Sequence, residues 1–129
     1  MSEVGLYLVK LNFTPPGGAV GAGSMTLALV VNASTGALSG QAHGEIMQGT
    51  AHPQTFTAEV SGTMHSTGYG NIVKVGSVSG QSAVSVAPPA IGTSLAPFLA
   101  SFGVDSNWSG KGRFSVGSNS YESDVNQVS

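Results

Sequence analysis

The chain has 129 residues, a formal net charge of −2 and no cysteine. Disulfide frameworks, thiol nucleophiles and thiolate metal sites are therefore excluded. Only 8% of the residues are charged, with 4 Lys and Arg against 6 Asp and Glu, so the basic surplus typical of nucleic-acid-binding proteins is missing. No run of about 20 apolar residues is present, and we expect no transmembrane helix.

The composition indicates a single all-β domain. Glycine is abundant, with 19 residues, and serine and threonine are frequent while lysine and glutamate are rare, which favours short strands and tight turns over helices. The length suits one domain over residues 1–129, and we expect a flexible tail from about residue 125. The low charge gives copies of the chain little mutual repulsion, so a homo-oligomer is also expected.

The N-terminus lacks the basic segment and the apolar segment of a signal peptide. We therefore expect a cytoplasmic protein, with export by a leaderless route left open.

Residues 4–13 predict the first strand. Alternate residues from Tyr7 to Phe13 are apolar and share one face of this strand. Leu6 and Leu8 lie on its other face, so the start of the strand is expected to be covered on both sides.

Alternation of apolar and polar residues recurs along the rest of the chain. The further strands that it predicts are residues 25–32, 37–46, 56–64, 72–78, 82–86, 108–116 and 120–124. Residues 93–103 fit two structures. Ser94 could cap a helix over residues 95–102 that Gly103 closes, or the same residues could form an edge strand, where proline is tolerated.

About eight strands with at most one short helix are the pattern of an antiparallel β-sandwich or a small β-barrel. Five glycines share positions that we expect to face inward: Gly40, Gly44, Gly62, Gly110 and Gly112. Inward glycines in this number predict strongly bent strands, as closure of a barrel requires.

Several short motifs also occur in a recognisable order. They are residues 4–10 (VGLYLVK), the hairpin over residues 27–46, Val60-Ser61-Gly62 before a Gly/Asn turn, and Trp108-Ser109-Gly110 before a strand. In this order the chain resembles a family of bacterial proteins described as domain of unknown function 1842. The late loop, residues 87–107, holds fewer prolines and aromatic residues than that family shows. The resemblance implies a bacterial origin and a compact β domain, and it brings no activity, cofactor or catalytic residue.

One group of residues has the chemistry of a metal or acid–base site. If residues 37–46 pair antiparallel with residues 56–64, one register sets His43 opposite Glu59, with Glu45 on the same polar face. A histidine with two carboxylates can bind a divalent metal or transfer protons. A solvated cross-strand ion pair explains the same residues, and no further ligand is positioned by the pattern. We therefore expect no metal, no cofactor and no enzymatic activity.

A second group could form stacking and hydrogen-bonding platforms for a sugar. Its members are Tyr69, Asn71, Asn107, Trp108, Asn119 and Tyr121. Trp108 also shares a strand face with Phe114 and Val116, so it could instead belong to the core.

These observations favour a non-catalytic β interaction module of unknown specificity, with a carbohydrate (a lectin-like role) or a protein as its partner. A structural, self-assembling protein without a small ligand is the alternative. Less favoured are a metal-assisted enzyme around His43 and Glu59 and a toxin component that inserts β-hairpins into membranes.

Overall fold

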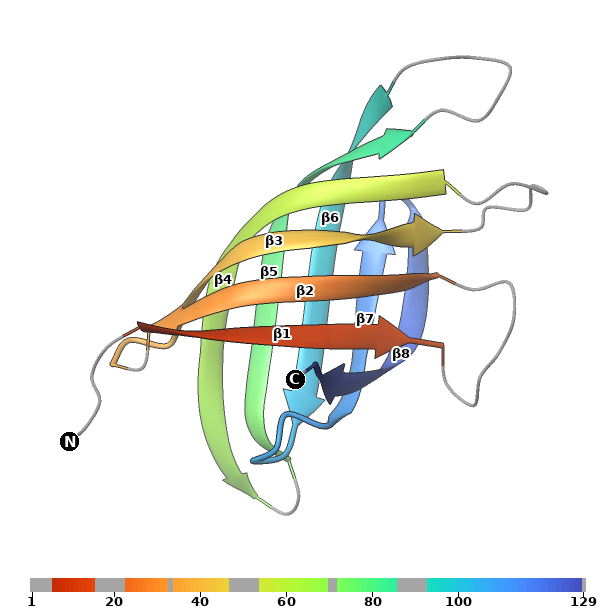
Figure 1. The fold of residues 1–129 in the computed structure, drawn as a ribbon. Helices are drawn as coiled ribbons and strands as arrows, with labels where there is room; N and C mark the ends of the chain where they lie inside the picture. The colour runs from red at the N-terminus through yellow and green to blue at the C-terminus, as the bar shows by residue number, and fades with distance from the viewer. Residues whose placement is uncertain are drawn as a thin grey trace.

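The computed structural model describes residues 6–15, 23–32, 34–46, 54–69, 72–85 and 93–128. Each strand pairs antiparallel with the next, and the last pairs with the first, so the eight strands close into a barrel (Figure 1). The strands are β1 (Leu6–Thr14), β2 (Ser24–Asn32), β3 (Ala37–Ile46), β4 (Gln54–Tyr69), β5 (Ile72–Ser85), β6 (Thr93–Val104), β7 (Gly110–Val116) and β8 (Asn119–Gln127). The predicted all-β antiparallel fold is confirmed, as a barrel rather than a sandwich. In this part of the chain no helix has the length and apolarity to cross a bilayer.

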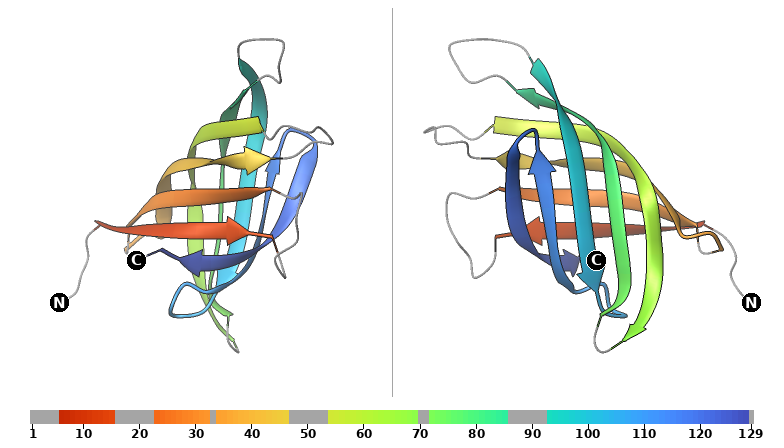
Figure 2. Two further views of the ribbon diagram at one scale, coloured as in Figure 1. Left: turned by 45° about the vertical axis from the view of Figure 1, so that its right-hand side comes forward. Right: turned by 180° about the vertical axis from the view of Figure 1, so that it is seen from behind.

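Strands on opposite sides of the barrel run in very different directions. In Figure 1, β1, β2 and β3 lie across the front, while β5, β6 and β7 run steeply behind them. β4 curves from one direction into the other, as the rear view in Figure 2 also shows.

Glycine makes this curvature sterically possible. A Cβ atom placed on Gly40 would lie 1.9 Å from the carbonyl oxygen of Ala28, and one on Gly62 would lie 1.8 Å from that of Ser77. Any residue with a Cβ atom would force the backbone to shift at a strand position where the neighbouring strand comes so close. The inward glycines therefore permit the bends that barrel closure needs, as the sequence indicated.

Side chains fill the interior of the barrel. Four fully buried phenylalanines form its centre: Phe13, Phe56, Phe98 and Phe114. The ring of Phe56 stacks on Phe114 at 5.9 Å, and Phe13 meets Phe114 edge-on at 6.2 Å. An eight-stranded barrel is just wide enough for such packing, so this centre is a hydrophobic core.

The structure differs from the predicted strands in the middle of the chain. Residues 72–85 form one continuous strand instead of two short ones, because Gly80 pairs with Val60 on one side and with Phe98 on the other. Residues 93–103 belong to β6, so they form a strand and not a helix. Alternate side chains from Phe98 to Val104 are buried in the core, the two-residue period of a strand. The expected edge position is wrong, because the backbone of β6 pairs with β5 on one side and with β7 on the other.

Both ends of the described chain also differ from expectation. The prediction of a flexible tail from about residue 125 is wrong up to Val128. Val125 is fully buried, and the Val128 N–H donates to the Lys10 carbonyl at 2.8 Å. The expected cover on both faces of β1 is also wrong. Leu6 and Leu8 on its outer face are 68% and 78% exposed.

The close approach at Gly62 predicts a severe effect of one added methyl group. Gly62→Ala should lower the free energy of unfolding by about 3 kcal/mol or more, because backbone must move to admit the Cβ. Ser61→Ala, on the exposed face of the same strand, should change it by less than about 0.5 kcal/mol. Urea unfolding of both variants makes the comparison, and equal midpoints would contradict the role given to Gly62.

Two buried serines predict opposite effects on stability. The Ser82 hydroxyl donates to the Ala96 carbonyl at 2.8 Å, whereas the buried Ser123 hydroxyl has no hydrogen-bond partner among the described residues. Ser82→Ala should therefore cost about 1 kcal/mol, and Ser123→Ala should stabilise the protein by about 1 kcal/mol. Thermal unfolding measures both, and destabilisation of similar size in the two variants would refute this distinction.

Candidate functional site

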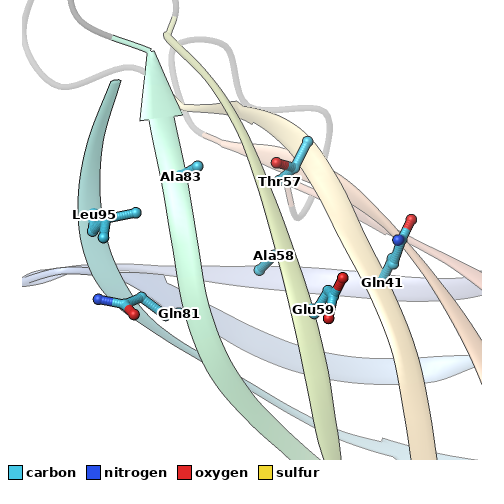
Figure 3. Close-up of a pocket in the computed structure, with 7 residues that line it drawn as sticks. All are labelled: Gln41, Thr57, Ala58, Glu59, Gln81, Ala83 and Leu95. Atoms are coloured by element: carbon cyan, nitrogen blue, oxygen red, sulfur yellow. The ribbon is translucent and has the colours of Figure 1, made fainter. Parts of the chain in front are cut away.

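A broad, open hollow of about 580 Å³ lies on the outer wall of the barrel. Its lining residues come from four neighbouring strands, β3 to β6 (Figure 3). They are Gln41, Thr57, Ala58, Glu59, Gln81, Ala83 and Leu95. Apart from the buried Ala58, these residues occupy the outward positions of the strand alternation, so the hollow lies outside the core.

Three polar side chains stand abreast in this hollow. The register places Gln41 opposite Glu59, and Glu59 opposite Gln81. Side chains at such positions are about 5 Å apart at their Cβ atoms. All three residues are exposed, so a carboxylate and two flanking amides present their donors and acceptors to solvent.

The next row of the hollow is more apolar. Thr57 is opposite Ala83, and Ala83 is opposite Leu95, whose side chain is 67% exposed. A ligand in the hollow would meet a polar row on one side and an apolar strip on the other. This arrangement suits a molecule with hydroxyl groups along its edge and C–H groups on its face.

A tight turn between β6 and β7 forms a second distinctive feature. The Asp105 carboxylate accepts hydrogen bonds from the N–H groups of Asn107 at 2.8 Å and Ser109 at 3.1 Å. The Trp108 N–H donates to the Asp105 carbonyl at 3.0 Å. Trp108 has a φ of 64°, a strained value for a bulky residue. The hydrogen bonds to Asp105 hold this conformation.

The Trp108 side chain belongs to the hydrophobic core. It is only 7% exposed, and it packs 6.5 Å from the ring of Tyr7 and 6.3 Å from that of Phe102. The Lys74 ammonium lies 4.2 Å from the indole centroid, a cation–π contact. Burial lowers the pKa of Lys74, and the charge of Asp105 partly opposes this shift. The core alternative for Trp108 is therefore correct.

Of the six residues predicted to bind a sugar, the five that the structure describes do not come together. Tyr69 ends β4, and Asn107 and Trp108 follow β6, at the lower end of the barrel in Figure 1. Asn119 and Tyr121 begin β8 at the opposite end, where the Tyr121 ring packs 5.1 Å from that of Phe114. Asn71 lies outside the described residues.

The predicted pairing of His43 with Glu59 is wrong by two residues. His43 is opposite Thr57, while Glu59 is opposite Gln41. In the observed register Gly40 faces Val60 and Gly44 faces Phe56, so each inward glycine is opposite a larger side chain. The predicted register would set Gly40 against Gly62 and leave a gap in the core.

The metal hypothesis depended on that register. Among the described residues, no three His, Asp or Glu side chains are close enough together to hold a metal ion. Glu45 lies on the exposed face of β3, outside the hollow described above.

Sequence reasoning overlooked most residues of the hollow, notably Gln41, Thr57, Gln81 and Leu95. The available signal was the run of uncharged polar residues at outward positions of successive strands. The register decides which of these residues are opposite one another across neighbouring strands. Leu95 lines the hollow because residues 93–103 form a strand.

Two tyrosines make the stability of the barrel pH-dependent. Burial raises the pKa of Tyr7 and of Tyr121 above the ordinary tyrosine value. The stabilisation from their protonated forms is complete below about pH 10 and is lost as the pH rises through the raised folded-state values. Urea unfolding at about pH 8 and pH 11 should therefore show a loss of stability that is smaller in the Tyr7→Phe, Tyr121→Phe double variant. The same loss in both proteins would contradict the role of these phenols.

Comparison with known proteins agrees with the motifs of the sequence. No curated protein matches the chain. The family model of the domain of unknown function 1842 matches residues 4–122, a range that begins two residues before β1 and ends within β8. The chain therefore belongs to the family of the domain of unknown function 1842.

Proposed function

We propose that this protein is a non-catalytic interaction module that binds carbohydrate in the outer hollow of β3–β6. The observation that carries the proposal is the row of Gln41, Glu59 and Gln81 beside the apolar strip of Ala83 and Leu95. Both rows are supplied by rigid, paired strands, so they are ordered before a ligand arrives.

The donor and acceptor chemistry of the row suits neighbouring hydroxyl groups. A carboxylate accepts hydrogen bonds, while each flanking amide both donates and accepts. Glu59 is the charged residue of the lining, which favours a neutral ligand over an anionic one. The exposed Leu95 offers an apolar surface to the C–H face of a sugar ring.

The shape of the hollow supports binding of an extended ligand. It is open and crosses four strands, whereas small-molecule pockets usually enclose most of their ligand. An oligosaccharide lying across the sheet would cover it, with the modest affinity expected of a shallow site. Glycoside hydrolysis normally requires two carboxyl groups beside the scissile bond, so the one carboxylate of this lining supports binding without catalysis.

A glycan array followed by calorimetric titration tests the proposal. We expect a related set of neutral glycans to bind, and Glu59→Gln and Gln81→Ala each to weaken binding at least tenfold, about 1.4 kcal/mol. Glu45→Gln is the matched control, because it removes an exposed carboxylate of β3 outside the hollow. A blank array, or equal affinities for the hollow variants and the control, would overturn the proposal.

A further inference from the structure

β1 extends beyond the strand that closes the barrel. It pairs with β2 from Leu6 onward, but with β8 only over Leu11–Thr14. Just before this paired stretch, the Lys10 carbonyl accepts a hydrogen bond from the Val128 N–H. In Figures 1 and 2 the start of β1 projects past the end of β8. Among the described residues, nothing pairs with this edge of β1 before Lys10.

The orientation of the unpaired backbone groups follows from Lys10. Its carbonyl points toward β8, and backbone direction alternates along an antiparallel strand. The N–H and C=O groups of Leu8 and Leu6 therefore point to the same side as that carbonyl. These groups form a short, open strand edge at the seam of the barrel.

The side chains along this edge are apolar. Leu6 and Leu8 are 68% and 78% exposed, the highest values among the exposed large hydrophobic residues of the described chain. Beside Leu8 lies a hollow of about 310 Å³ whose lining includes Lys10, Ala28 and Val128. An exposed apolar edge strand is a template for pairing with another strand.

We propose that this edge pairs antiparallel with the same edge of a second copy of the chain. The two-fold axis would pass between the two Tyr7 residues, so Leu6 of one copy is opposite Leu8 of the other. Leu6 of each copy then exchanges two backbone N–H···O=C hydrogen bonds with Leu8 of the other copy. A register shifted toward Lys10 would need the Lys10 carbonyl as an acceptor between the copies, but this carbonyl already accepts a hydrogen bond from the Val128 N–H.

The edge is complementary to itself. In this register, Leu6 of one copy falls beside Leu8 of the other, next to the hollow that Lys10 and Val128 line. The two Lys10 side chains lie at opposite ends of the pairing, about 20 Å apart, beyond the range of strong repulsion at physiological salt. The contact is small, so we expect a weak dimer with a Kd in the micromolar range.

Sedimentation velocity over a range of protein concentrations tests the dimer. We expect reversible dimerisation, which Leu6→Asp with Leu8→Asp should weaken at least tenfold. The matched control is Val75→Asp with Leu99→Asp, since these residues of β5 and β6 are also exposed, at 41% and 53%, and lie outside the glycan hollow. A monomeric wild-type protein at every concentration, or equal weakening by both double variants, would overturn the proposal.

Cross-linking tests the register, because the chain has no cysteine of its own. Directly opposed residues without mutual hydrogen bonds have Cα atoms about 4.5 Å apart, within disulfide range. Tyr7→Cys should therefore form a covalent dimer under mild oxidation, and Leu8→Cys should not. Cross-linking through Leu8→Cys instead, or through neither, would overturn the pairing proposed. No residue of the glycan hollow takes part, so this dimer and the proposed binding function can fail separately.

Discussion

The fold depends on the close approach of strand backbones at inward-facing glycines. At Gly40 and Gly62 the neighbouring carbonyl oxygen occupies the space that a side chain would need. This approach allows β3 and β4 to bend, and β4 turns from the direction of β1–β3 into that of β5 and β6 (Figure 1). Barrel closure, the register of β3 with β4, and the placement of the outer hollow all follow from these bends.

The phenylalanine cluster fills the centre of the barrel, and both of the proposed binding surfaces lie on its outside. Charged side chains are distributed unevenly over the outer wall of the barrel. On β7 and β8, Lys111 pairs with the half-buried Asp124, and the exposed Arg113 pairs with the exposed Glu122. Such surface pairs contribute about 0–1 kcal/mol each. The wall of β3–β6 around the hollow is mainly uncharged and polar, which suits it to recognise a neutral ligand.

Barrel closure also explains the open edge of β1. A barrel removes the strand edges of a sheet only where its first and last strands pair along their full lengths. Here β8 stops at the level of Lys10, while β1 pairs with β2 from Leu6 onward. The seam is therefore closed at one end and leaves two leucines on an unpaired edge at the other. The same geometry that completes the core creates the surface proposed for dimerisation.

The all-β class, most strand positions and the inward glycines could be predicted from the sequence, because alternation and glycine placement are local properties. The sequence also identified the family through motifs along most of the chain. The choice between helix and strand for residues 93–103 could not be made from this segment alone, since the burial of Phe98 and Phe102 depends on the pairing of β6 with β5 and β7. Likewise, the row of Gln41, Glu59 and Gln81 exists only in the observed register. That register is set by how glycines and large side chains pack across strands, a non-local constraint that no single segment contains.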